Sequence, residues 1–384
     1  MNTQALYDLS PTLHLMIIGM LIALGPLAWV WLRNKKASAV GRLRALTVFT
    51  LFLTFDLVMF GAFTRLTDSG LGCPDWPGCY GAASPTGAQA EINQAQQAMP
   101  TGPVTHGKAW IEMLHRYLAT SVGVLIITMT AASWLQHRRG EHSINPWWPT
   151  LTLAWVCIQG AFGALTVTMK LFPAIVTLHL LGGVVLLVLL THQAVRYAQV
   201  LRASAQVVLA PGLRKWLITV LALVWLQIAL GGWVSTNYAV LACSDFPTCQ
   251  GSWWPEMHFQ QGFELWRELG KTAASEHIDF ASLTAIHYVH RLFAFGVLAA
   301  LSLLAWRLHR VRGLQITARW VLALAAWQLA TGLSNVVLGW PLLAAVGHTG
   351  GAAALVVVLS WTLSAASTEN GPAVAQSRRG SVPA

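Results

Sequence analysis

Charge is what this sequence has least of. Only 10% of its 384 residues are Asp, Glu, Lys or Arg, whereas about 25% is usual in soluble domains. Hydrophobic residues make up 55% of the chain. A chain this poor in charge is not an ordinary soluble protein, and we expect it to lie in a lipid bilayer.

Nine apolar segments are long enough to cross a bilayer as helices, which takes about 20 residues each. They cover about residues 12–32, 43–65, 112–135, 147–169, 173–196, 214–236, 284–306, 316–338 and 342–364. Backbone polar groups in lipid must be satisfied within their own segment, so all these segments are predicted to be α-helices. The expected fold is an all-α polytopic membrane protein.

The net charge of +10 does not indicate a nucleic-acid partner, because the basic residues fall in alternate loops. They cluster at residues 33–44, 138–139, 196–215, 307–319 and 378–379, while the intervening loops carry mostly Asp and Glu. By the positive-inside rule the clusters are cytoplasmic, which places the N-terminus outside and the C-terminus inside. The first span lacks a basic flank and a clear cleavage site, so it is not predicted to be a removed signal peptide.

A group of motifs occurs twice along the chain. The stretch from Cys73 to Gly81 returns from Cys243 to Gly251, His115-Arg116 returns as His290-Arg291, and His179 returns as His348. The first Cys and the first His are 42 and 47 residues apart, and the two His are 64 and 58 residues apart. Repetition on this scale indicates a duplicated structural unit.

The duplication predicts the organisation of the chain. Residues 1–42 form an extra helix and a basic loop, 43–198 a first four-helix unit, 199–212 a cytoplasmic linker, 213–365 a second four-helix unit, and 366–384 a disordered tail. A unit of four spans ends on the side where it began. The two units are therefore expected to be parallel repeats, related by an axis along the membrane normal.

Four of the five cysteines form the two repeated pairs, in long outer loops at about 66–111 and 237–283. The space outside a bacterial inner membrane is oxidising, so we predict the disulfides Cys73–Cys79 and Cys243–Cys249. Each pair is either a staple that holds its loop over the site or a redox-active pair, and the sequence leaves both roles open. Cys157, alone within a span, is predicted to be a small core residue.

Four histidines lie within about six residues of the outer end of a span: His115, His179, His290 and His348. In each unit the two spans concerned run in the same direction, so their imidazoles lie at similar depth and can face each other across a porphyrin. Imidazole is a common axial haem ligand, and a polar side chain at membrane depth is functional by default. We predict a haem site in each unit, with hydrogen-bonded core histidines as the alternative. Zinc is disfavoured, because neither unit offers a third clear ligand.

Arginines and glycines flank these histidines. Arg116 and Arg291 follow the first histidine of each unit, where a guanidinium can pair with a haem propionate or extend to the interface. The glycines Gly182, Gly183, Gly350 and Gly351 follow the second histidine of each unit. They would let a flat macrocycle approach the helix, or let helices pack closely.

The two units differ at positions near their histidines. Glu112 lies three residues before His115, so both face the same side of one helix, while the equivalent residue before His290 is His287. Arg65 aligns with Ser235. The first unit thus has an additional carboxylate and guanidinium. A carboxylate there can relay protons or stabilise positive charge during an oxidation, or it simply favours a helix N-terminus.

These residues together resemble the haem A synthase family. The resemblance rests on Gly61-Ala-Phe-Thr-Arg-Leu-Thr-Asp-Ser-Gly-Leu71, Glu112-Met-Leu-His115-Arg116, His290-Arg291, the other two histidines and both cysteine pairs, and it covers about residues 43–365. It implies an oxidoreductase that converts a methyl group of haem O to the formyl group of haem A for terminal oxidases. The paired cysteines resemble those of the bacterial branch. The family usually has eight spans, so the additional first span is a departure.

The resemblance also implies roles for the two halves. The first half would hold haem O as substrate and haem A as product, with Glu112 at the active site. The second would hold a haem b through His290 and His348. Expected partners are haem O synthase and terminal oxidase assembly factors, together with an unknown electron donor, membrane lipid and a second copy in a homo-oligomer. Other functions that use the same residues are a di-haem b electron-transfer cytochrome, a haem carrier and a thiol oxidoreductase.

Overall fold

The structure, a computed structural model, describes residues 10–201 and 207–368. In this part of the chain nine helices are long and apolar enough to cross a membrane, and each one covers a predicted segment. They are α1 (Ser10–Arg33), α2 (Ala39–Leu66), α4 (His106–Arg138), α5 (Trp147–Thr168), α6 (Pro173–Val200), α7 (Pro211–Thr236), α9 (Phe280–His309), α10 (Gln315–Val337) and α11 (Leu342–Ala365). The protein is an all-α polytopic membrane protein, as predicted.

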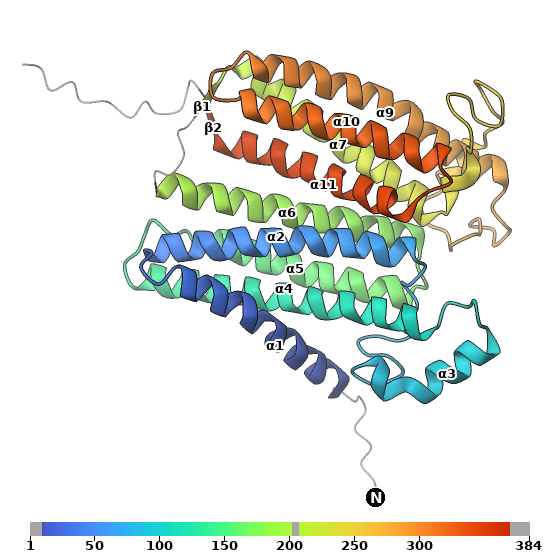
Figure 1. Ribbon diagram of the computed structural model, residues 1–384, viewed down its shortest axis with the longest axis horizontal. Helices are drawn as coiled ribbons and strands as arrows, with labels where there is room; N and C mark the ends of the chain where they lie inside the picture. Colours follow the sequence, from blue (N-terminus) through green and yellow to red (C-terminus); the bar gives the residue numbers. More distant parts are fainter. Residues whose placement is uncertain (1–9, 202–206, 369–384) are drawn as a thin grey trace, which may run out of the picture.

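The long helices form two four-helix bundles that lie side by side (Figure 1). The first bundle contains α2, α4, α5 and α6, and the second contains α7, α9, α10 and α11. Within each bundle neighbouring helices share extensive contacts, and α2 and α6 of the first bundle contact α11 and α7 of the second. Helices α6 and α11, which occupy equivalent positions, also contact each other. A contact between equivalent helices places them next to the axis that relates the two bundles.

Helix α1 belongs to neither bundle. It packs mainly on α4 and diverges from the first bundle towards the N-terminus (Figure 1). The closest packing is at Gly19, where a Cβ atom would lie 2.5 Å from Cγ2 of Thr120. A residue without a side chain is therefore required for this crossing.

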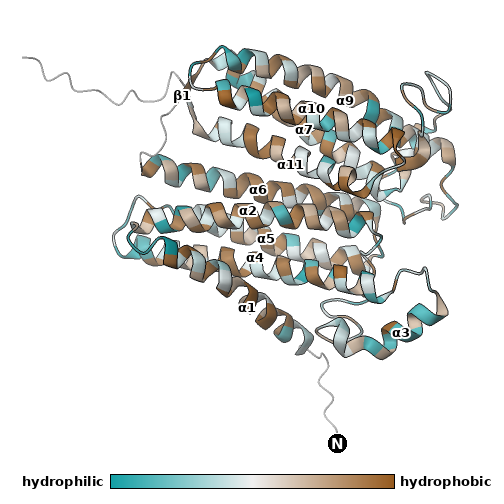
Figure 2. Ribbon diagram, viewed as in Figure 1, coloured by the Kyte–Doolittle hydropathy of each residue, from teal (hydrophilic) through white to brown (hydrophobic). Residues whose placement is uncertain are grey.

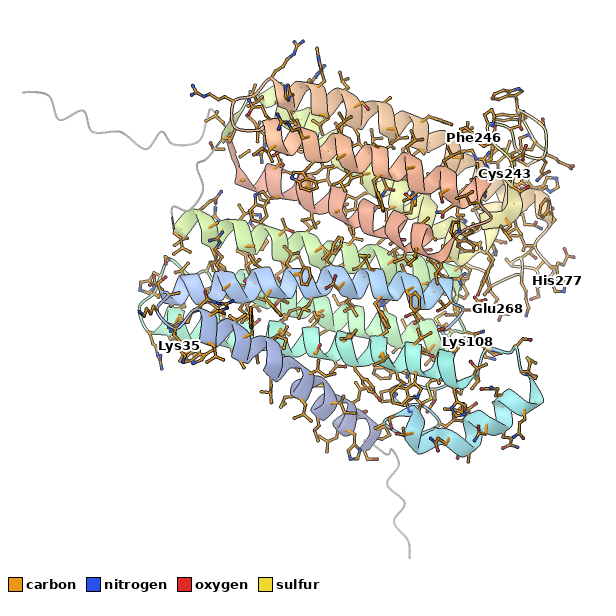
Figure 3. All side chains as sticks on the ribbon, in the orientation of Figure 1. Lys35, Lys108, Cys243, Phe246, Glu268 and His277 are labelled. Carbon is orange, nitrogen blue, oxygen red and sulfur yellow. A yellow bond between two sulfur atoms is a disulfide. The ribbon has the colours of Figure 1, made fainter. Side chains whose placement is uncertain are left out.

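The two ends of the molecule differ in composition. Polar residues gather in the loops at both ends, and the helices between them are largely apolar (Figure 2). One end carries both disulfide loops, with Cys243, Phe246 and His277, and the opposite end carries the basic turn with Lys35 (Figure 3). We call these ends the disulfide side and the basic side.

Short elements occupy the loops. On the disulfide side these are η1 (Pro85–Ala88), α3 (Gln89–Ala98), η2 (Ala239–Ala242) and α8 (Phe259–Gly262). On the basic side β1 (Val207–Leu209) pairs in parallel with β2 (Ala366–Thr368). The prediction of a disordered tail from residue 366 is wrong for residues 366–368, because pairing with the linker satisfies their backbone hydrogen bonds. Residues 202–206 of the predicted linker and 369–384 of the predicted tail lie outside the described residues.

Candidate functional site

Each bundle brings its two predicted histidines together from two helices. His115 on α4 and His179 on α6 are near enough to interact electrostatically, and so are His290 on α9 and His348 on α11. In the second bundle both rings line one cavity, whose walls are largely aliphatic. Two imidazoles on a shared apolar cavity match the needs of a flat, bis-imidazole-ligated macrocycle.

A glycine on a neighbouring helix lies against each of the four histidines. A Cβ atom on Gly61 would lie 3.1 Å from Nε2 of His115, and one on Gly163 would lie 3.5 Å from Cε1 of His179. In the second bundle the corresponding distances to Cε1 are 2.8 Å from Gly231 to His290 and 3.3 Å from Gly332 to His348. These glycines leave room for the rings, and the sequence analysis did not single them out. Their nearly equal spacing in the two repeats, 102 residues from Gly61 to Gly163 and 101 from Gly231 to Gly332, was the signal that could have found them.

The glycines that follow the second histidine of each unit have a different role. A Cβ atom on Gly182 would lie 1.9 Å from the Nε2 atom of Gln159, and one on Gly351 would lie 2.4 Å from that of Gln328. Gly350 likewise lies against Met59. The described contacts of these glycines are with other helices, as expected from small residues that pack transmembrane segments.

The ring nitrogens of the second bundle are hydrogen-bonded. The amide nitrogen of Gln227 lies 3.1 Å from Nδ1 of His290 and 3.5 Å from its Nε2. The hydroxyl of Thr331 lies 2.9 Å from Nδ1 of His348. The Thr331 hydroxyl can accept the N–H of Nδ1, as a ligating imidazole requires, whereas the amide nitrogen of Gln227 is a donor and restrains the ring of His290 without accepting its proton. Gln227 and Thr331 are a second set of residues that the sequence analysis missed.

The first bundle lacks this arrangement. Nδ1 of His179 is buried without a hydrogen-bond partner among the described residues. His115 makes no ring hydrogen bond within residues 10–201 and 207–368, and Phe60 stacks on it with ring centroids 6.3 Å apart. The two bundles therefore hold their histidines with different degrees of restraint.

Both predicted disulfides are present on the disulfide side, Cys73–Cys79 and Cys243–Cys249. All four cysteines have 0% exposure. In each loop the aspartate of the motif closes the turn. Asp75 accepts hydrogen bonds from the backbone N–H groups of Tyr80 and Gly81.

The free Cys157 is exposed on α5, so the prediction that it lies in the core is wrong. Helix α5 turns that side away from the bundle.

Asp245 has the same role in the second disulfide loop as Asp75 has in the first. Its carboxylate accepts hydrogen bonds from the Thr248 hydroxyl and from the N–H groups of Gln250 and Gly251. These bonds, that of Thr248 first, lower the pKa of Asp245 to about 2. The turn is therefore held by an ionised carboxylate over the physiological pH range.

Arg116 and Arg291 bind the disulfide loops. The guanidinium of Arg116 donates to the backbone carbonyls of Asp75, Pro77 and Gly78. The guanidinium of Arg291 donates to those of Cys243, Asp245 and Thr248. Each arginine thus supports its site by fastening a loop to the helix that carries the first histidine. Contact with a haem propionate stays a prediction.

Glu112 is buried, with 4% exposure, and both of its carboxylate oxygens are engaged. Oε2 accepts a hydrogen bond from the backbone N–H of Cys73 at 2.7 Å, and Oε1 pairs with Arg116. The sequence predicted a helix that starts at residue 112, but α4 starts at His106, so Glu112 lies in its second turn. A carboxylate paired with a guanidinium, one turn before His115, can accept a proton or stabilise positive charge.

The equivalent residue of the second bundle has a structural contact instead. Nδ1 of His287 bonds to the carbonyl of Ala239 in η2 at 3.0 Å. His287 also lines the cavity that His290 and Arg291 line. The second bundle has no carboxylate at this position.

Arg65 joins the two bundles. One guanidinium nitrogen donates to the carbonyl of Ser235 at 2.5 Å, and the group lies over the ring of Tyr238 at 3.9 Å. The hydroxyl of Tyr238 donates to Asp68 at 2.6 Å, and Asp68 also pairs with Arg65. The described contacts of Arg65 are thus with Asp68, just after its own helix, and with Ser235 and Tyr238 of the other bundle.

Haem fits the residues that are present better than a small metal site does. Within the described residues no group of three or more His, Cys, Asp or Glu could hold a metal ion. Two imidazoles per bundle, a cavity with aliphatic walls and a glycine against each ring suit a planar group bound from two opposite sides. Nδ1 of His179 is buried without a hydrogen-bond partner among the described residues, and an imidazole that binds a group brought into the site would account for this.

Comparison with known proteins is consistent with this geometry. A family model described as cytochrome oxidase assembly protein matches residues 44–360. A relative from Shewanella oneidensis named heme A synthase is 37% identical over 313 residues, which are 81% of this chain and 92% of that protein. Relatives of the same name from Halalkalibacterium halodurans and Caulobacter vibrioides are 27% and 28% identical, over 83% and 80% of this chain and 94% and 90% of theirs.

Proposed function

The chain belongs to the haem A synthase family, and on that basis we propose that its first bundle oxidises haem O while its second bundle holds a haem b. The protein is an oxidoreductase that converts a methyl group of haem O to the formyl group of haem A. The proposal concerns which residues perform this reaction and where.

The difference in histidine restraint is the observation that carries the proposal. In the second bundle the Thr331 hydroxyl can accept the N–H of Nδ1 of His348, as a firmly held metal ligand requires, and the Gln227 amide nitrogen contacts the ring of His290. When bound there, haem b supplies one-electron chemistry. In the first bundle His179 has no such partner. A ring held less firmly suits a substrate that must arrive, react and leave.

Glu112 is the proposed catalytic residue of the first bundle. Conversion of a methyl group to a formyl group removes protons and electrons from the carbon and adds one oxygen atom. Water or dioxygen must supply that atom, an external oxidant must take the electrons, and a nearby base can take up the protons. Arg116 pairs with Oε1 of Glu112, and the N–H of Cys73 orients Oε2. The residue at this position in the second bundle is His287, which is bonded to η2. Because the second bundle has a histidine in place of this carboxylate, the difference supports oxidation in the first bundle only.

The substitution Glu112→Gln tests this role, because Gln keeps the shape of the side chain and removes its charge. We expect haem O to remain bound while haem A formation falls by about 100-fold or more, the range for loss of a general acid or base. The assay is chromatography with mass detection of haems B, O and A, from membranes that also contain a haem O synthase. The control is Glu91→Gln, at an exposed carboxylate of α3. Haem A production at the normal rate in Glu112→Gln would contradict the proposed role.

The substitutions His290→Ala and His348→Ala test the haem b assignment. Each removes one ligand from the second bundle, so we expect loss of haem B from the purified protein while bound haem O or haem A is retained. The control is His277→Ala, at an exposed residue on the disulfide side. Unchanged haem B content in both variants would show that the second bundle binds haem through other residues.

The orientation and partners follow from the same reasoning. We propose that the disulfide side faces the oxidising space outside a bacterial inner membrane and that the basic side is cytoplasmic. Haem O synthase and terminal oxidase assembly factors are the proposed partners, since they supply the substrate and use the product.

A thiol oxidoreductase is the alternative that the geometry disfavours. Exchange requires a partner thiolate to reach a disulfide sulfur, and all four cysteines of the pairs are fully buried. Arg116 and Arg291 hold the same loops. The burial of the four cysteines therefore supports a structural role for both disulfides.

A further inference from the structure

A groove lies between α1 and α2 on the basic side, away from both histidine pairs. It has a volume of about 650 Å³ and includes the turn that joins the two helices. Most of its length is lined by large apolar side chains, among them Trp29, Val48, Phe49 and Phe52. Val48 and Phe52 are 42% and 60% exposed. The groove therefore presents an apolar channel to the surrounding lipid.

The end of the groove at the turn is polar. Asn34 and Arg44 line it there. The side-chain amide nitrogen of Asn34 donates to the carbonyl of Val30 at 2.8 Å, so this donor is already used. Among the described residues that line the groove, Arg44 is the only one with a cationic side chain.

One N–H donor of the Arg44 side chain has no hydrogen-bond partner among the residues that the structure describes. Its Nε is buried and has no hydrogen-bond partner in the described part of the chain. Two neighbouring arginines are placed differently, with Arg33 over the ring of Trp29 at 4.8 Å and Arg42 over that of Trp31 at 5.5 Å. The buried Nε does not face the groove, so a headgroup there would meet the outer nitrogens of the guanidinium, whose planar geometry suits a phosphate.

The surrounding charge has a single sign. Residues 33–44 contain Arg33, Lys35, Lys36, Arg42 and Arg44 and no Asp or Glu. A cluster of this kind next to a membrane-spanning helix attracts anionic headgroups, by about 1 kcal/mol for each Lys or Arg. Lys35, in the turn between α1 and α2, lies at the edge of the molecule on the basic side (Figure 3).

From this arrangement we infer that the groove binds one anionic phospholipid, with the phosphate on Arg44 and an acyl chain along Val48, Phe49 and Phe52. A cation at one end and an apolar channel at the other match the two parts of such a lipid. A neutral quinone would fill the channel and leave the guanidinium without an anion. The inference concerns α1, the helix that neither bundle includes, and it assigns that helix one wall of a lipid site.

Native mass spectrometry of the full chain in detergent tests the inference. Phosphatidylglycerol is titrated into the wild type, Arg44→Gln and Arg42→Gln, with phosphatidylcholine as the zwitterionic comparison. We expect Arg42→Gln to bind phosphatidylglycerol up to about five-fold more weakly than the wild type, the effect of one cation near an anionic headgroup, and Arg44→Gln to bind it more weakly still, because it also loses the direct contact with the phosphate. Equal binding by Arg44→Gln and the wild type would overturn the inference, and so would equal retention of phosphatidylcholine or a tightly held neutral quinone.

A second pair of variants tests the acyl channel without changing charge. Val48→Trp fills the groove at a lipid-exposed position, and Leu21→Trp places the same side chain on α1 at a residue that is 62% exposed and does not line the groove. We expect Val48→Trp to lose the retained phosphatidylglycerol and Leu21→Trp to keep it. Retention by Val48→Trp would show that the lipid lies elsewhere. Haem content measured on the same samples verifies that each variant is folded.

Discussion

At the scale of single residues, the fit of each histidine depends on a glycine of the neighbouring helix. Gly231 is the closest, since a Cβ atom there would lie 2.8 Å from Cε1 of His290. Carbon atoms in van der Waals contact are about 3.5–4.0 Å apart. Any side chain at Gly231 therefore requires the imidazole to move.

The substitution Gly231→Ala is expected to displace His290 and to weaken haem B retention by about 10-fold or more, as changes around metal ligands do. The control is Gly296→Ala on α9, where a Cβ atom would meet nothing within 4 Å. Replacing Gly by Ala in an open helical position favours the helix by about 1 kcal/mol, so this control should not lose stability. Haem spectra of the two purified proteins measure the difference, and equal haem B content would contradict the expectation.

The histidines themselves were predictable from the sequence, whereas their surroundings were not. His115, His179, His290 and His348 stand out because they repeat at membrane depth. Gln227 and Thr331 differ between the repeats, so the duplication gives no signal for them. Their contact with a ring depends on how α7 and α10 are rotated about their own axes, which side-chain packing decides.

At the scale of elements, the disulfide loops are fastened to the long helices at several points. Asp279 is the N-cap of α9, and its side chain accepts a hydrogen bond from the N–H of Ser282 at 2.7 Å. The other carboxylate oxygen lies 2.5 Å from Nδ1 of His258, which belongs to the loop. The start of the helix that carries His290 is thus joined to the loop by a titratable pair.

Stability is expected to depend on pH through His258. The hydrogen bond and the charge of Asp279 raise the pKa of His258 above its usual 6.5. A raised pKa means that the folded state binds the proton more tightly, so the contribution is fully present below about pH 6.5 and is lost as pH rises through the higher folded pKa. Melting temperatures measured from pH 5 to 9 in the wild type and His258→Gln should differ in slope over this range. Parallel curves would rule out the contribution.

Cysteine pairing was predictable from the sequence, while the role of the loops was not. A spacing of six residues and an oxidising compartment sufficed to predict the two disulfides. That Arg116 and Arg291 bind the carbonyls of those loops depends on the loops folding back over the helices. Sequence spacing alone does not contain this information.

At the scale of the whole molecule, the two bundles meet near their relating axis on the disulfide side. Arg65 contacts Ser235, and Asp68 contacts Tyr238, and both pairs are 170 residues apart. The equivalent cysteines of the two repeats, Cys73 and Cys243, have the same separation in sequence. Each of the two contacts therefore joins equivalent positions of the repeats. Equivalent positions of two repeats can touch only close to the axis, so Arg65 and Tyr238 join the bundles there.

The substitution Arg65→Gln removes the bond to Ser235 and the contact with the Tyr238 ring. We expect a loss of about 2 kcal/mol in the free energy of unfolding, from one charged hydrogen bond and one cation–π contact. Tyr238→Phe keeps the ring and loses only the bond to Asp68, so its effect should be smaller. Thermal unfolding in detergent measures both. An effect of Tyr238→Phe equal to or larger than that of Arg65→Gln would be inconsistent with a junction centred on the guanidinium.

The sequence by itself determined the membrane class, the nine spans, the duplication, the cysteine pairs and the four histidines. All of these follow from composition, hydrophobic length and repetition, which are properties of the chain in one dimension. Only the tertiary structure decided that Arg65 joins the bundles, that glycines of neighbouring helices face the rings, and that Glu112 bonds to the backbone of Cys73. Those contacts depend on the rotation and crossing of helices, which are set by side-chain packing between segments far apart in the chain.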